Sequence, residues 1–353
     1  MTLRQTIRFR TAPDGARIAV ASVGHGPPLL RAAHWLSHVE YDLESPVWRP
    51  WLKALAERNT YIRYDQRGCG LSDRNPTVIS FEAWLSDLEA VADTIDEPSF
   101  PMLGMSQGGA LAIAFALRHP GRVSKLILVG AYARGSLQRA SSEAARLEAR
   151  TLVDMIRVGW GQDNPAFRQA FANMFIPGGT AEQHRWWSEL ERISSSPEIA
   201  ARTLEHLQQI EVSDIAGRLD LPTLVMHSRG DARVPFEEGR RLAALIPGAR
   251  FVPLDSDNHV LLPTEPAWAR FHAELQAFLA PAGANERQNA AIRSGLTAAE
   301  AEVLTFVAEG LDNRAIAARL GKSEKTVRNQ VSAILTKLGV RSRSEAIVRA
   351  LSG

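Results

Sequence analysis

The sequence predicts an α/β fold over residues 1–280, followed by a small all-helical domain over residues 295–353. Three observations lead to this expectation. Short aliphatic runs alternate with helical patterns in the first region, one interval near residues 134–207 carries helical patterns alone, and residues 295–353 hold only short helical patterns. Alternating strands and helices are typical of a mostly parallel sheet with helices on both faces.

The strands of this sheet are expected where short β-branched or aliphatic runs occur. These runs span residues 28–33, 61–64, 99–105, 125–130, 222–227 and 250–254, and their lengths suit buried strands. Between them, amphipathic helical patterns cover residues 48–57, 81–95, 110–118, 236–245 and 266–279.

Residues 134–207 interrupt this alternation, because they contain no convincing strand pattern. They are rich in large apolar side chains, among them Met155, Trp160, Phe171 and Trp187. An insertion between two sheet strands is expected to lie over the edge of the sheet, so this segment is predicted to form a helical cap. Its aromatic residues could line a binding site or could simply pack the cap against the sheet.

The composition indicates a soluble cytoplasmic protein. Hydrophobic residues make up 45% of the chain and charged residues 23%, which is enough for a sizeable core. The one cysteine, Cys69, has no partner for an intrachain disulfide, as is usual in a reducing compartment. Residues 1–10 lack the apolar segment of a signal peptide, and no apolar run approaches the roughly 18 residues that span a membrane.

A candidate nucleophile, Ser106, lies in the segment Gly-Met-Ser-Gln-Gly-Gly that begins at Gly104. The segment follows a predicted strand and opens a predicted helix. In a Gly-x-Ser-x-Gly turn of this kind the serine is held on a strained bend, and the flanking glycines (here Gly104 and Gly108) leave room for it. The amino end of the helix that follows also favours a developing negative charge.

Asp231 and His259 are the candidate partners of Ser106. Asp231 follows the predicted strand 222–227, and His259 follows the last predicted strand. The chain order Ser, Asp, His is that of a nucleophile, an orienting acid and a general base. Asp255 and Asp257 are rival acids, but their closeness to His259 in the sequence favours a role in a surface turn.

Two backbone N–H groups are needed to stabilise the oxyanion of an acyl-transfer intermediate. The residue directly after the nucleophile, Gln107, is expected to supply one of them. The loop after the strand 28–33 is expected to supply the other, at Trp35. No metal-binding cluster, phosphate-binding loop or dinucleotide fingerprint appears in the sequence, so neither a metal nor a cofactor is expected.

Residues 15 to about 280 resemble the α/β-hydrolase superfamily. Besides the Ser106, Asp231 and His259 segments, residues 63–73 (RYDQRGCGLSD) look like that superfamily's Asp-x-Arg-Gly-x-Gly-x-Ser segment. The resemblance implies an α/β-hydrolase sheet with a helical cap and an acyl ester, thioester or lactone as ligand or substrate. Asp65 and Arg67 are expected to hold the turn and an ion pair.

The chain changes character after residue 280. Residues 281–294 carry small and polar residues without apolar periodicity and are predicted to form a linker. Thr297 and Glu300 have the spacing of a capping box for a first helix. A second helix is expected at 313–320, a third at 324–338 after a tight turn at Gly321, and a fourth after Ser342.

Residues 295–351 resemble the DNA-binding domain of LuxR-type regulators. The resemblance rests on the ordered set Leu296-Thr297, Glu302-Val303-Leu304, Glu309-Gly310-Leu311, Asn313, Ile316-Ala317, Leu320, Thr326-Val327 and Lys337-Leu338-Gly339-Val340. It implies that the third helix enters the major groove of double-stranded DNA. Positive charge gathers in this segment, at Lys322, Lys325, Arg328, Lys337, Arg341 and Arg343.

Two groups of DNA contacts are expected within this domain. Arg328, Asn329 and Ser332 lie where base-reading residues would project, since arginine favours guanine and asparagine favours adenine. Phosphate contacts, which set the register on the duplex, are expected at Lys325, Thr326, Lys337, Arg341 and Arg343.

These features lead to one main hypothesis and two alternatives. The main hypothesis is a DNA-binding transcription regulator whose α/β-hydrolase domain binds a small acyl compound, with or without cleaving it, and which acts as a homodimer on two half-sites. The first alternative is an active esterase or lactonase whose last domain only localises or oligomerises it. The second is a DNA-binding protein with a catalytically silent hydrolase scaffold.

Overall fold

The protein is described by a computed structural model that covers residues 3–280 and 295–352. Within it the chain divides into two compact units, Met1–Leu275 and Gln276–Gly353. The linker predicted at residues 281–294 lies outside the described residues.

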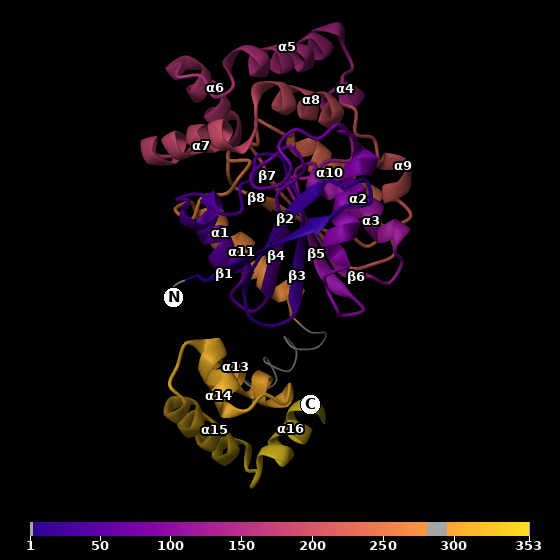
Figure 1. Cartoon of the computed structure of the whole chain (residues 1–353). Coiled ribbons are helices and arrows are strands. Elements are labelled where there is room, and N and C mark those ends of the chain that lie inside the picture. The colour runs from indigo at the N-terminus through magenta and orange to yellow at the C-terminus, as the bar shows by residue number, and fades with distance from the viewer. Residues whose placement is uncertain (1–2, 281–294, 353) are drawn as a thin grey trace. The chain divides into compact units, whose positions relative to one another are not determined.

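The first unit is built on one eight-stranded sheet in the order β1-β2-β4-β3-β5-β6-β7-β8 (Figure 1). Strands β3 to β8 pair in parallel, and β1 and β2 pair antiparallel at one edge. The strands are β1 Gln5–Thr11, β2 Arg17–Gly24, β3 Pro28–Ala32, β4 Thr60–Tyr64, β5 Phe100–Met105, β6 Val123–Val129, β7 Thr223–Ser228 and β8 Arg250–Leu254. The mostly parallel sheet is therefore confirmed.

The hairpin of β1 and β2 was not predicted, because no strand was expected before residue 28. Strand β1 (QTIRFRT) has only Ile7 and Phe9 as apolar residues and is largely exposed, so it lacks the continuous apolar run that marks a buried strand. It forms because every residue of β1 pairs with β2, from Gln5 opposite Val23 to Thr11 opposite Arg17. Such pairing depends on a partner strand more than on the strand's own sequence.

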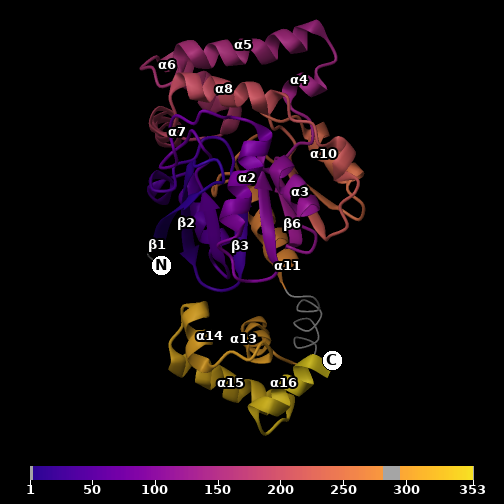
Figure 2. The ribbon, with the colours of Figure 1, turned by 45° about the vertical axis from the view of Figure 1, so that its right-hand side comes forward.

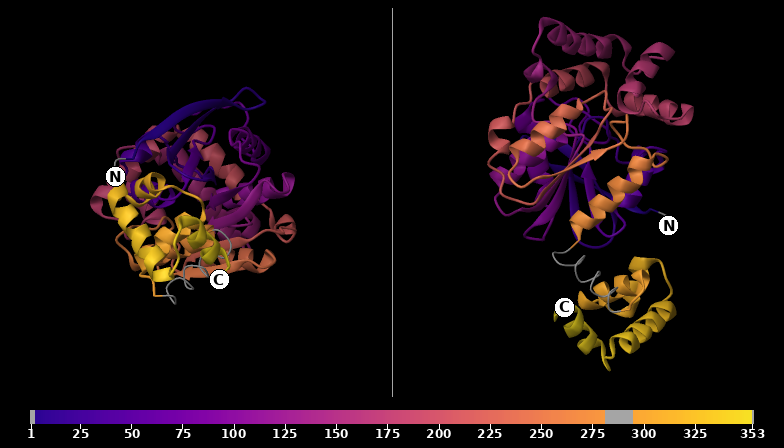
Figure 3. Two further views of the ribbon diagram at one scale, coloured as in Figure 1. Left: turned by 90° about the horizontal axis from the view of Figure 1, so that it is seen from below. Right: turned by 180° about the vertical axis from the view of Figure 1, so that it is seen from behind.

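Helices cover both faces of the sheet. Helices α2 (Phe81–Ala92) and α3 (Gly108–Arg118) lie over one face (Figure 2). On the other face, α1 (Trp48–Leu55) packs against α11 (Pro266–Leu279), which crosses the sheet in the view from behind (Figure 3). The rings of Trp51 and Phe271 join these two helices, with centroids 4.5 Å apart. Helix α10 (Phe236–Leu245) packs on β7, and the short elements are η1 (Tyr41–Glu44) and α9 (Ser213–Ala216).

The insertion between β6 and β7 is helical, and it lies beyond the carboxyl ends of the strands (Figure 1). Its helices are α4 Ser136–Arg139, α5 Glu143–Gly159, α6 Pro165–Phe175, α7 Ala181–Ser194 and α8 Pro197–Gln208. Local sequence sets where they begin: Ser142, Asn164, Thr180 and Ser196 each accept a backbone N–H at a helix start. The cap is held to the body in part by the stacked rings of Trp35 and Trp160, whose centroids are 5.3 Å apart.

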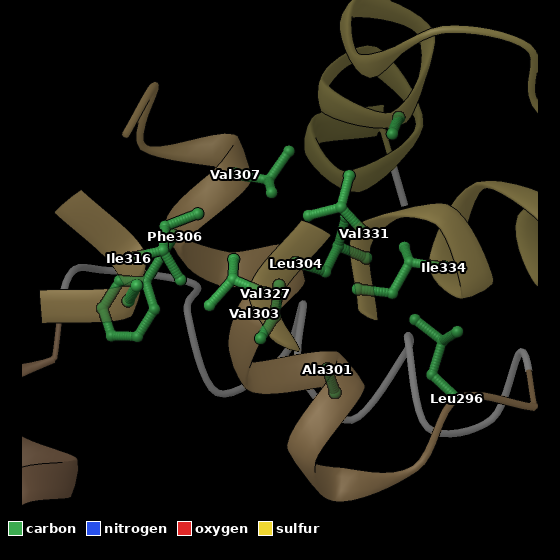
Figure 4. Close-up of a cluster of buried hydrophobic side chains, with 12 residues drawn as sticks. Leu296, Ala301, Val303, Leu304, Phe306, Val307, Ile316, Val327, Val331 and Ile334 are labelled. Atoms are coloured by element: carbon green, nitrogen blue, oxygen red, sulfur yellow. The ribbon is translucent and has the colours of Figure 1, made fainter. Parts of the chain in front are cut away.

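The second unit consists of four helices around a small apolar core (Figure 4). They are α13 Ala298–Ala308, α14 Asn313–Leu320, α15 Glu324–Leu338 and α16 Arg343–Ser352. Val303, Phe306, Ile316, Val327 and Ile334 are all at most 4% exposed in this core. Thr297 and Glu300 form the predicted capping box, and Gly321 and Gly339 end their helices with φ near +60°.

A buried ion pair tightens the first unit next to the turn that follows β4. Arg67, 1% exposed, contacts the carboxylate of Asp87 at 2.6 Å, and Asp87 is fully buried. Arg67 also binds the half-exposed Asp14 at 2.6 Å. Burial raises the pKa of Asp87 to about 6, against the opposing effect of Arg67. Without Arg67 the buried Asp87 carboxylate would lose its cation partner, and keeping it charged would cost free energy.

Replacing Arg67 by Met is therefore expected to lower the free energy of unfolding of the first unit by about 3–5 kcal/mol. All eight tryptophans lie between Trp35 and Trp268, so tryptophan fluorescence in a urea titration follows this unit alone. Arg17→Met is the matched control, because the Arg17–Asp73 pair is at the surface, with Arg17 71% exposed; its effect should stay below about 1 kcal/mol. Equal losses in the two variants would contradict this role of Arg67.

Candidate active site and nucleic-acid interface

Ser106 lies on the turn between β5 and α3, with φ +51°. This left-handed backbone is strained for a residue with a side chain. The turn is crowded: a Cβ at Gly104 would come within 2.6 Å of the Gly109 Cα, and one at Gly108 within 2.9 Å of the Ala32 and Ala33 carbonyl oxygens. Only glycines allow β5, α3 and the end of β3 to approach this closely, so the motif predicted from sequence has a steric reason.

Asp231 and His259 are brought together from the loops after β7 and β8. The His259 Nδ1–H donates to Asp231 Oδ2 at 2.7 Å. Asp231 Oδ1 accepts the backbone N–H groups of Arg233 at 2.9 Å and Val234 at 2.8 Å. Burial alone would raise the pKa of Asp231, but the His259 ring, the nearby His227 and the Val234 N–H lower it overall. The carboxylate thus stays charged and fixes the tautomer of His259.

Ser106 and His259 line one small cavity of about 30 Å³ under the cap. Its other walls are mainly aromatic, from Trp48, Tyr132, Phe175 and Trp187. The Phe175 ring meets His259 edge-on, with centroids 5.8 Å apart, and stacks on Trp187 at 5.1 Å. A space of this size holds about one or two waters.

The two candidate oxyanion donors, Trp35 and Gln107, line this same cavity. Gln107 stands at the amino end of α3, where the first backbone N–H groups of a helix have no intrahelical acceptor. Trp35 follows β3, and the turn there is fixed by the His34 Nδ1–H, which donates to the Trp35 carbonyl at 2.8 Å. Neither backbone N–H is bonded to a protein acceptor in the part of the chain that the structure describes.

Three further residues at this site were missed in the sequence analysis. His227, fully buried on β7, lies 3.5 Å from Asp231 Oδ2, and its Nε2–H donates to the Val234 carbonyl at 2.9 Å. His34 is buried, and its desolvation lowers its pKa well below the usual value, so it is neutral. The third is Arg233. No local motif singles out these residues, because their role depends on which loops meet at the sheet edge.

Asp255 and Asp257 are exposed and are not among the residues that line the cavity. Across residues 3–280 and 295–352, no group of three or more His, Cys, Asp or Glu side chains is placed to hold a metal ion. None of the helices in those ranges combines the length and apolarity that crossing a membrane requires.

In the second unit, α15 presents one buried and one exposed face. Val327, Val331 and Ile334 face the core at a spacing of four and three residues. The opposite face carries the exposed side chains of Lys325, Thr326, Arg328, Asn329 and Ser332. The candidate base-reading residues therefore share one free surface of a helix that follows a tight turn, as groove-binding helices require.

The candidate phosphate contacts are not equivalent. Lys325 and Arg341 are exposed. Lys337 Nζ donates to Glu300 Oε2 at 2.7 Å and so ties α15 to the capping box of α13. Arg343 donates to the Asn313 side chain at 3.1 Å and to the Leu311 carbonyl. Both side chains thus serve the packing of the helices, a role that the charge pattern did not reveal.

The Lys337–Glu300 pair is expected to stabilise the second unit. Replacing Lys337 by Met should speed amide hydrogen exchange in α13 and α15 at pH 7, measured by mass spectrometry, whereas Arg341→Met should leave it unchanged. Lys337 is the main reason that the pKa of Glu300 falls to about 2. A lowered carboxyl pKa stabilises the fold above pH 4.5, and this contribution is lost as the pH falls towards 2. Equal exchange in both variants would show that the pair adds nothing.

Comparison with known proteins gives two family matches. The family described as "alpha/beta hydrolase fold" matches residues 41–266, and the family described as "Bacterial regulatory proteins, luxR family" matches residues 294–350. The first match spans more than half of the chain.

The individual relatives cover from two thirds to about three quarters of the chain. The AB hydrolase superfamily protein YisY of Bacillus subtilis is 26% identical over 243 residues, covering 68% of this chain and 87% of that protein. A putative carbamate hydrolase, RutD, of Agrobacterium fabrum is 25% identical over 268 residues, covering 70% of this chain and 98% of that protein. Among solved structures, an esterase from Exiguobacterium antarcticum is 25% identical with a TM-score of 0.64, covering 77% of this chain and 98% of that one.

Proposed function

Because the chain belongs to the α/β-hydrolase fold family and carries a luxR-family regulatory domain, we propose that it is a transcription regulator that senses a small acyl compound. The observation that carries the proposal is the presence, in one chain, of the Ser106–His259–Asp231 arrangement and an exposed groove-binding helix. The luxR-family match favours this function over that of an esterase with a passive tail.

The ligand would bind beneath the cap, with its carbonyl carbon next to Ser106. His259 would take the hydroxyl proton on Nε2, since its Nδ1–H is held by Asp231, and would return it to the leaving group. The backbone N–H groups of Gln107 and Trp35 would stabilise the oxyanion. The names of the relatives, carbamate hydrolase and esterase among them, suit an acyl compound with a cleavable bond.

The size of the cavity suggests how binding could be sensed. Since about 30 Å³ admits little more than water, a ligand must displace cap rings such as Phe175 or Trp187. A ligand that binds only the displaced arrangement shifts the population towards it. In this proposal the cap movement changes how the DNA-binding domains of a dimer are presented to two half-sites.

On DNA, α15 would lie in the major groove. Arg328, Asn329 and Ser332 would read bases, while Lys325, Thr326 and Arg341 would contact phosphates. Arg328 pairs with Glu324 at 2.8 Å, but both side chains are largely exposed, so the pair is weak and can be exchanged for a base contact. Lys337 and Arg343 could reach a phosphate only by giving up contacts within the domain.

For the enzyme chemistry, Ser106→Ala is expected to abolish turnover of short p-nitrophenyl esters, by roughly 10³-fold or more, because the nucleophile is lost. Ser99→Ala, at an exposed serine directly before β5 and outside the cavity, can serve as a control for handling and folding. Turnover that persists unchanged in Ser106→Ala would show that the triad assignment is wrong. Loss of turnover with ligand-dependent DNA binding retained would show that sensing needs binding and not cleavage.

For DNA binding, Arg328→Ala should weaken the affinity for the specific operator by roughly 1–3 kcal/mol and relax the base preference of the domain. Lys325→Ala should instead weaken binding to all sequences alike and lower the slope of log affinity against log salt by about 1. Footprinting on the upstream region of its own gene, with salt titrations, measures both effects. If the unaltered chain binds no DNA at low salt, with or without ligand, the regulator proposal fails.

A further inference from the structure

The cavity beneath the cap carries a positive charge that the triad does not need. Arg233 lines it together with Ser106 and His259, two residues after the acid of the triad. No Asp or Glu side chain is found among the described residues that line the cavity. The other walls are aromatic, apolar or neutral, so the guanidinium is the fixed charge that a bound ligand would meet.

The geometry holds this guanidinium at the cavity. The Arg233 backbone N–H is fixed on Asp231 Oδ1 at 2.9 Å, and the guanidinium carbon lies 5.8 Å from the centre of the Phe175 ring. That ring also meets His259 edge-on. Arg233 is thereby positioned over the same aromatic wall that the general base contacts.

Within the described residues, Arg233 has no carboxylate to pair with. Both oxygens of Asp231 are occupied, by the His259 ring on one side and by backbone N–H groups on the other. Glu238, on the neighbouring helix α10, is paired with Arg134 at 2.6 Å. Burial, with the nearby Arg139 adding to it, lowers the pKa of Arg233. A half-buried guanidinium without a counter-ion is costly, and a bound anion would relieve that cost.

Arg233 also stands at the junction of two spaces. Besides the small cavity, it lines a wider groove of about 860 Å³ with Arg139 and with apolar cap residues such as Leu152 and Met155. The guanidinium of Arg139 lies 5.9 Å from the centre of the Tyr132 ring, which is another wall of the small cavity. Arg233 and Arg139 therefore place positive charge between the triad and the groove, whose lining also includes the exposed Glu148.

We propose that Arg233 is a specificity-determining residue, and that the ligand or substrate of this site is an acyl compound with a carboxylate a few carbons from its reactive carbonyl. Arginine suits this task, because its planar fork can donate two parallel hydrogen bonds to a carboxylate. The proposal rests on the proposed function of the same site. It narrows the substrate from acyl compounds in general to anionic ones.

The test compares two esters of equal shape, monoethyl succinate, which is charged at pH 7, and ethyl succinamate, which is neutral. Released acid is titrated at constant pH, and the unaltered chain should show a kcat/KM at least about tenfold higher for the charged ester. In Arg233→Met this ratio should fall close to one, and in Arg233→Lys, which keeps the charge, it should fall only in part. Arg240→Met, an exposed arginine outside the cavity, is the matched control and should keep the full ratio.

The possible outcomes separate this inference from the function on which it rests. Turnover of both esters that depends on Ser106 but shows no preference in the unaltered chain overturns the role of Arg233 and leaves the triad standing. If neither ester is turned over, the catalytic part of the proposed function fails, and calorimetry decides the inference. Tighter binding of monoethyl succinate than of ethyl succinamate, weakened at least tenfold in Arg233→Met, then supports it, and equal binding of the two esters overturns it.

Discussion

The parallel alignment of strands β3 and β5 to β8 is the constraint on which the candidate site depends. Parallel strands end at a common edge, so the loops after them lie next to one another although they are far apart in the sequence. Ser106 follows β5, Asp231 follows β7 and His259 follows β8. The 2.7 Å bond between His259 and Asp231 joins loops that are 28 residues apart, and it exists because β7 and β8 are neighbours in the sheet.

The cap turns this open edge into an enclosed space. The chain leaves the sheet after β6, forms the five cap helices α4 to α8 and the short α9, and returns at β7. The two ends of the cap meet where Arg134 pairs with Glu211. Its aromatic rings pack against rings from the body, as Trp160 does with Trp35 and Phe175 with His259. Such walls exclude bulk water and strengthen electrostatic interactions within the cavity. For this reason the unpaired guanidinium of Arg233 would attract an anionic ligand more strongly here than it would at the surface.

The second unit shows how the same basic residue types serve different purposes in a small domain. Its core is small, and the amino ends of α13, α14 and α15 are fixed by the capping side chains of Thr297, Asp312 and Ser323. Lys337 and Arg343 hold the helices together, whereas Lys325 and Arg328 extend into solvent. Positive charge therefore contributes both to the stability of the domain and to the surface offered to DNA.

Local signals in the sequence were sufficient to predict much of the secondary structure and several residues of the candidate site. The strand and helix order after residue 28, the strained turn at Ser106, the capping box at Thr297 and the helices around Gly321 all depend on residues near one another in the chain. The positions of Ser106, Asp231 and His259 after predicted strands, and their order in the chain, marked them as candidates, in agreement with the family resemblance. The hairpin of β1 and β2, the buried histidine at His227, the intradomain contacts of Lys337 and the place of Arg233 were decided only by the tertiary structure. These features depend on which distant segments become neighbours, and burial and pairing arise only once the sheet edge and the helix core have formed.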